Sequence, residues 1–169
     1  MTNSFEEFSR AKMFFVIGSN MTEAHPVAAT FVKNAVLKGA KLIVADPRRH
    51  KLVDFADRHL ALKVGSDIAL LNSLMYVLIK EGLYDREFVN SCCIGFNDLE
   101  ETVATYPPEK AEPICGIAAD TIRDTARMLA SVKPVMVCYT LGITEHTCGK
   151  NNVMSIANLQ MLLDRKSVV

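Results

Sequence analysis

Apolar residues along the chain form four short unbroken runs, and these runs alternate with longer stretches of helical spacing. The runs lie within residues 13–17, 41–45, 59–62 and 134–139. Each run is too short for a helix and is flanked by turn-forming residues, a pattern typical of strands covered on both faces in a parallel sheet. We therefore predict four strands at these positions.

The stretches between the runs carry helix start and stop signals. Pro26 can occupy the first turn of a helix that ends at Gly39, and Ser66 is a suitable N-cap for a helix that ends at Gly82. The first two strands and the helix between them form a βαβ unit, whose right-handed crossover makes the strands parallel. Other helical segments are expected at residues 4–8, 51–56, 85–90, from 97 onward, at 121–130 and at 152–163, with a breaker at 107–108.

These elements predict the fold class α/β, as one αβα domain over residues 1–169. The expected architecture is three-layered and Rossmann-like, with a mostly parallel sheet of about four strands and a helical insertion before the last strand. Strand order 3-2-1-4 follows if the first strand is central. Val16, Ile17, Ile43, Val44 and Val137 are then expected to be buried.

A polar or glycine-containing stretch follows every predicted strand. These stretches are Gly18-Ser19-Asn20 with Glu23 and His25, then residues 46–49, 65–67 and 142–149. The carboxyl ends of parallel strands share one edge of a sheet, where α/β proteins bind ligands at the point at which strand order reverses. Helix N-termini near Pro26 and after Ser66 suit a diphosphate. The sequence thus favours a nucleotide-like ligand at this edge.

The stretch after the second strand has the most distinctive chemistry. Pro47 cannot extend a strand ladder, so Asp46 and Arg48 are expected just beyond the carboxyl edge. A carboxylate there can accept from ribose hydroxyls, and an arginine can donate to phosphate or a purine edge. A solvated turn explains these residues equally well.

Composition narrows the class of protein further. The chain has 169 residues, half of them apolar, and 19 basic residues balance 19 acidic ones. Because the charges balance, the chain has no net positive charge that would attract nucleic acid or an anionic membrane. No apolar run is long enough to span a bilayer. With no signal peptide recognised, we expect a cytoplasmic protein.

The cysteines and histidines predict no metal held by this chain. Five cysteines are an odd number without a Cys-x-x-Cys pair, and the four histidines lack metal-ligand spacing. The adjacent Cys92 and Cys93 could be redox-active, although small hydrophobes at a helix end are the favoured interpretation.

Two common nucleotide motifs are missing. The first loop is not Gly-x-Gly-x-x-Gly, and Asp46 lies about 28 residues after Gly18 rather than about 20, which disfavours an ordinary NAD site. No Gly-x-x-x-x-Gly-Lys-Ser/Thr occurs, which excludes a P-loop NTPase by pattern.

Three blocks of the sequence resemble molybdopterin-dependent formate dehydrogenase catalytic subunits. They are Val-Ile-Gly-Ser-Asn-Met-Thr-Glu-Ala-His-Pro at 16–26, Gly-Ala-Lys-Leu-Ile-Val-Ala-Asp-Pro-Arg-Arg at 39–49 and Gly-Ile-Thr-Glu-His-Thr-Cys-Gly at 142–149. Their order and approximate separation match too, from about Met1 to Leu163. The third block is closer to formate dehydrogenases than to nitrate or dimethyl sulfoxide reductases of the superfamily.

The resemblance implies a domain that binds one molybdopterin guanine dinucleotide, with molybdenum or tungsten as the metal. Asp46 and Arg48 would hold its guanosine end. The other implied cofactor-binding residues are Gly18, Asn20, Glu23, His25, Gly65, Ser66, Asp67, Leu141, Gly142, His146 and Thr147. For His25, a helix-capping role next to Pro26 is an equal alternative.

The family's chemical residues are expected outside this chain. Its iron–sulfur cysteines and its metal-ligating cysteine or selenocysteine would precede Met1, and its active-site arginine would follow the last helix, so we expect no iron–sulfur cluster, catalytic residue or metal ligand here. Expected partners are the remaining domains of a catalytic subunit, with electron-transfer subunits as further candidates. The alternatives are a free-standing nucleotide-binding module and a fragment of another molybdopterin oxidoreductase, such as a nitrate reductase.

Overall fold

The computed structural model describes residues 4–163 and is built on a four-stranded parallel sheet. Its order is β3-β2-β1-β4, and Met13 of β1 pairs with Lys41 of β2 and Val135 of β4. The predicted strand order and direction are therefore confirmed. The strands are β1 Met13–Ile17, β2 Lys41–Ala45, β3 Arg58–Leu60 and β4 Val135–Tyr139.

Strand β3 ends two residues earlier than predicted. The backbone N–H of Leu62 donates to the carbonyl of Leu60 at 2.9 Å, and that of Lys63 donates to Cys115 at 2.8 Å. The chain turns away from β2 because these donors are used outside the sheet ladder.

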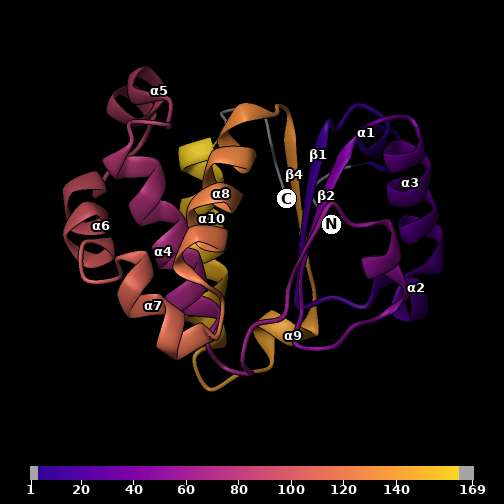
Figure 1. Ribbon diagram of the computed structural model, residues 1–169. Coiled ribbons are helices and arrows are strands. Elements are labelled where there is room, and N and C mark those ends of the chain that lie inside the picture. Colours follow the sequence, from indigo (N-terminus) through magenta and orange to yellow (C-terminus); the bar gives the residue numbers. More distant parts are fainter. Residues whose placement is uncertain (1–3, 164–169) are drawn as a thin grey trace.

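Helices cover both faces of the sheet, which confirms the predicted layers. One face carries α1, α2 and α3, whereas α4, α8 and α10 lie over the other face, with α5, α6 and α7 beyond them (Figure 1). The helices are α1 Phe5–Phe8, α2 Met21–Ala24, α3 Pro26–Leu37, the 3₁₀ helix η1 Lys51–Phe55, α4 Asp67–Lys80, α5 Arg86–Cys92, α6 Phe96–Val103, α7 Pro108–Cys115, α8 Ala119–Ser131, α9 Leu141–Thr144 and α10 Gly149–Leu163.

Alternate residues of β1 supply two separate apolar cores. Phe14 and Val16 pack into the layer of α3, while Phe15 and Ile17 pack into the larger layer around α4, α8 and α10. All five β1 residues are buried, as a central strand covered on both faces requires. The residues predicted to be buried, Val16, Ile17, Ile43, Val44 and Val137, are all in the core.

Several helix starts differ from the sequence prediction, among them α8, which begins at Ala119 rather than at 121. Helix α6 begins at Phe96, one residue before the predicted Asn97, because Gly95 takes φ +76° and its carbonyl accepts from the N–H of Leu99. The pair at 107–108 opens α7 instead of only breaking a helix, since Pro108 occupies the first turn, where no N–H is needed. Helix α10 begins at Gly149 rather than at 152.

Candidate functional site

The four polar stretches lie at the carboxyl ends of the four strands, toward the end of the molecule that carries α2 and α9 (Figure 1). The first and fourth stretches contact each other through their backbones. The carbonyl of Gly18 accepts from the N–H of Gly142 and from the hydroxyl of Thr140, each at 3.1 Å. A Cβ on Gly142 would lie 2.5 Å from that carbonyl oxygen, so the approach requires glycine.

Asp46 is a buried carboxylate with fixed surroundings. Its residue is 4 % exposed, and its Oδ1 accepts from the N–H of Arg48 at 2.8 Å. Nε2 of His59 lies 2.9 Å from the backbone carbonyl of Asp46. The side chain of Arg48 is 73 % exposed. A solvated turn accounts for Arg48 but not for a carboxylate held out of water.

Asp67 is a second buried carboxylate and the first residue of α4. Burial raises the pKa of Asp67, and the negative charge of Asp46 acts in the same direction, whereas His146 lowers it. The second, third and fourth polar stretches are therefore within electrostatic reach of one another. The free N–H groups of the first turn of α4 point toward the same edge.

Ser66 lies at the predicted N-cap of α4, but its side chain does not cap the helix. Its hydroxyl donates to the carbonyl of Lys63 at 2.6 Å, and its backbone N–H donates there as well. The hydroxyl thus closes the turn in which Gly65 takes φ +80°. The predicted capping bond is wrong because a loop carbonyl competes for the same hydroxyl.

The remaining residues from the first stretch are more exposed. Asn20 accepts from the Thr22 hydroxyl at 2.8 Å. Glu23 and His25 are exposed, and the ring of His25 makes no capping hydrogen bond to α3. The capping role considered for His25 is therefore not seen, and its side chain can face a ligand.

In the fourth stretch, His146 folds back on its own loop. Its Nε2 lies 2.9 Å from the carbonyl of Gly142. Leu141 and Thr147 are exposed beside it. The stretch thus presents an apolar side chain, a hydroxyl and an imidazole near the Gly18–Gly142 contact.

Sequence reasoning missed two buried polar side chains at this edge. Ser19 and His50 are buried, and within residues 4–163 the Ser19 hydroxyl and both ring nitrogens of His50 have no hydrogen-bond partner. Such groups are costly unless a partner arrives. No sequence motif marks these two residues. The only signal in the sequence is their position, since Ser19 follows β1 and His50 lies four residues after Asp46.

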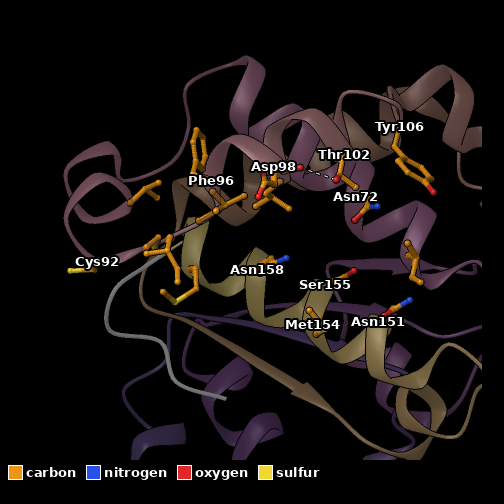
Figure 2. Close-up of a pocket in the computed structure, with 18 residues that line it drawn as sticks. Asn72, Cys92, Phe96, Asp98, Thr102, Tyr106, Asn151, Met154, Ser155 and Asn158 are labelled. Atoms are coloured by element: carbon orange, nitrogen blue, oxygen red, sulfur yellow. Dashed lines mark hydrogen bonds between the residues drawn. The ribbon is translucent and has the colours of Figure 1, made fainter.

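A groove of about 710 Å³ lies elsewhere, between α5, α6 and the facing sides of α4 and α10. Figure 2 shows Asn72, Asn151, Ser155 and Asn158 along it, with Asp98 close to Thr102. Asp98 is the one charged side chain among the described lining residues, so the groove offers no cation for a phosphate. The carboxyl edge is the better candidate for an anionic nucleotide.

Two further features are absent from the described part of the chain. No group of three or more His, Cys, Asp or Glu side chains within residues 4–163 is arranged to hold a metal ion. No helix in the same range is long and apolar enough to cross a bilayer.

The parallel sheet, its layers and the gathered loops define an α/β protein with its candidate site at the carboxyl edge. The chain belongs to the molybdopterin oxidoreductase family, whose model matches residues 1–167.

Similar proteins include formate dehydrogenases. The chain is 42 % identical to formate dehydrogenase H of Escherichia coli (strain K12), over 96 % of this chain and 23 % of that protein. It is 43 % identical to the F420-dependent formate dehydrogenase 1 subunit alpha of Methanococcus maripaludis, over 96 % of this chain and 24 % of that protein. Acetylene hydratase from Pelobacter acetylenicus has the same fold, with a TM-score of 0.87, 34 % identity and coverage of 92 % and 22 %. The chain thus spans about a quarter of the length of these relatives.

Proposed function

We propose that residues 1–169 form one cofactor-binding domain of a molybdenum- or tungsten-dependent formate dehydrogenase catalytic subunit. The domain binds one molybdopterin guanine dinucleotide and works with the remaining domains of the subunit and with electron-transfer subunits. The observation that carries the proposal is the pair of buried carboxylates, Asp46 and Asp67, from two loops at one sheet edge. Membership of the family and the formate dehydrogenases among its relatives support it.

The residues at the edge match the chemistry of a guanosine diphosphate group. Asp46 can accept from ribose hydroxyls, and Asp67 can accept from the N1–H and N2–H₂ donors of guanine. Arg48 and the first turn of α4 supply donors for phosphate. The buried Ser19 hydroxyl has no hydrogen-bond partner among the described residues, so it could pair with a ligand at this edge.

The other end of the cofactor would lie against the first and fourth stretches. Asn20, Glu23 and His25 offer polar groups from one side, and Leu141, Gly142, His146 and Thr147 line the other side. The bound cofactor supplies the two-electron redox centre, while this chain binds and orients its nucleotide end.

The guanosine site can be tested by calorimetry with guanosine diphosphate. Asp46→Ala removes acceptors worth roughly 1.5–3 kcal/mol, so affinity should fall about tenfold or more. Asp120→Ala is the matched control, because Asp120 is a carboxylate on α8 with a side chain 96 % exposed. Equal affinity of a folded Asp46→Ala variant and the wild type would move the ligand away from this edge.

Formate as the substrate depends on the relatives rather than on this edge. Acetylene hydratase has the same fold, and a nitrate reductase of Symbiobacterium thermophilum is 36 % identical to the chain. Nucleotide binding without catalysis by this chain is the second candidate function, since the described residues offer no metal-binding cluster. Both candidates predict binding without turnover by the isolated chain, so the protein sequence encoded on either side of this chain is what separates them.

A further inference from the structure

His50 is a buried histidine beside the proposed guanosine site. It lies four residues after Asp46, and its side chain is only 4 % exposed. Nε2 of His50 is 3.9 Å from Oδ2 of Asp46, which is too long for a hydrogen bond. Neither ring nitrogen has a partner within the described range. A neutral imidazole always carries one N–H, so a donor is left unpaired in this state.

The two oxygens of Asp46 have different surroundings. Oδ1 accepts from the backbone N–H of Arg48 at 2.8 Å. Oδ2 is the oxygen that faces His50. The backbone carbonyl of Asp46 is already within hydrogen-bond distance of His59. Among the described residues, Oδ1 and the backbone carbonyl of Asp46 are thus held by hydrogen bonds, whereas Oδ2 is not, so the carboxylate can still rotate.

Resting on the proposed nucleotide site, we propose that His50 is a positioning residue for Asp46. In the neutral tautomer that carries its hydrogen on Nε2, the imidazole of His50 donates a hydrogen bond to Oδ2 when Asp46 accepts from the ribose. This bond fixes the plane of the carboxylate. A closure of about 1 Å brings the pair from 3.9 Å to hydrogen-bond distance. The ligand thus completes the pairing of a donor that is unsatisfied in its absence.

The charge state of His50 suits a neutral donor. Burial lowers the pKa of His50 below its ordinary value; Asp46 and Glu23 oppose this shift, while Arg48 and His59 add to it. The ring is consequently neutral near pH 7, and the contact with Asp46 is a hydrogen bond to a carboxylate rather than an ion pair.

Packing alone is the competing explanation for His50, and leucine separates the two. Leucine fills a similar volume in this buried position but has no polar atoms. If His50 only fills space, His50→Leu leaves guanosine diphosphate affinity unchanged. If it positions Asp46, affinity falls about tenfold, as is typical when a residue that orients a ligand-binding side chain is lost.

A double-mutant cycle gives the decisive test. Guanosine diphosphate affinity is measured by calorimetry for the wild type, His50→Leu, Asp46→Ala and the double variant, with urea unfolding to check folding. The expected result is a roughly tenfold loss from His50→Leu in the wild-type background and no further loss in the Asp46→Ala background. Equal losses in both backgrounds, or no loss in either, overturn the positioning role. No effect of Asp46→Ala is a separate outcome, which overturns the proposed nucleotide site itself.

Two further readouts respond to the hydrogen bond and not to packing. His50→Gln retains a side-chain N–H donor, so it should recover affinity to within about threefold of the wild type. In long-range ¹H–¹⁵N spectra, adding guanosine diphosphate should give a His50 ring protonated at Nε2. A ring protonated at Nδ1 in the complex, or no recovery in a folded His50→Gln variant, contradicts the proposal.

Discussion

At the scale of single residues, the site is distinguished by where polar groups are buried. Asp46 and Asp67 are acidic residues out of water, and the guanidinium of Arg48, which pairs with Asp46 at 3.7 Å, is itself largely exposed. Buried carboxylates in that situation are more useful for accepting hydrogen bonds from a ligand than for stabilising the fold.

Asp67 should select guanine among purines. Inosine lacks the exocyclic amine of guanine, so the wild type should bind guanosine diphosphate more tightly than inosine diphosphate by roughly 1–3 kcal/mol. Asp67→Asn exchanges one acceptor oxygen for a donor and should remove most of that preference. Calorimetry with both nucleotides measures it. A preference that survives in Asp67→Asn would assign base recognition to another residue.

His50 should make stability sensitive to acid. Its folded pKa is lowered from 6.5 by burial, so the unfolded chain takes up the proton first as the pH falls below 6.5. Stability due to this group is complete above pH 6.5 and is lost as the pH falls toward the folded pKa. Urea unfolding at pH 7 and pH 5 should therefore show a larger loss for the wild type than for His50→Gln. Parallel losses would mean that His50 is not protected from protonation.

Sequence reasoning identified Asp46 and Asp67 but overlooked Ser19 and His50, for a physical reason. Position after a strand is visible in the sequence, and it is enough to bring a side chain to the ligand edge. Whether a side chain there is buried and without a partner depends on loops from other parts of the chain. His50 lies within electrostatic reach of Glu23 in α2 and His59 in β3, and no local pattern in the sequence specifies that.

At the scale of elements, the apolar runs predicted the strands well because a central parallel strand is buried on both faces. The sequence did not predict the two shortest helices at the carboxyl edge, because they are too short to show a pattern. Helices α2 and α9 have four residues each, which is too few to display a helical period. Both lie in the polar stretches after β1 and β4, so the loops are more ordered than the sequence indicated.

The contact between these two loops gives a test at this scale. Gly142→Ala would place Cβ 2.5–2.9 Å from backbone atoms of Gly18, which cannot rotate away as a side chain does. The free energy of unfolding should fall by about 3 kcal/mol, at the upper end for overpacking. Gly39→Ala is the control, because Gly39 has φ +101° but open space around it. Its cost should be only about 1–2 kcal/mol; a Gly142→Ala variant as stable as the wild type would mean that the loops separate freely.

At the scale of the whole molecule, this chain corresponds to about a quarter of the length of the formate dehydrogenases it resembles. The family relationship and the fold are established for this part. The reaction depends on groups around a metal, and the fold alone does not determine it.

The isolated chain should bind nucleotide but not oxidise formate. Reactivity of a metal cofactor depends on its ligands and axial groups, and no metal-binding cluster occurs within residues 4–163. Cys148 lies within the fourth polar stretch, and its Sγ lies 3.6 Å from Oδ1 of Asn152 on α10. Formate-dependent dye reduction after reconstitution with molybdenum cofactor is the measurement. Turnover that disappears in Cys148→Ser would make Cys148 the metal ligand.

The strand order also has a consequence for how the chain is made. Met13 of β1 pairs with Val135 of β4, so about 120 residues must be translated between the two partners. At typical elongation rates this interval is on the order of ten seconds. During it, β1 and β2 can pair, but the other edge of β1 remains open on the ribosome. The loop carrying Gly142 emerges later still, so the ligand edge is assembled only near the end of synthesis of these 169 residues.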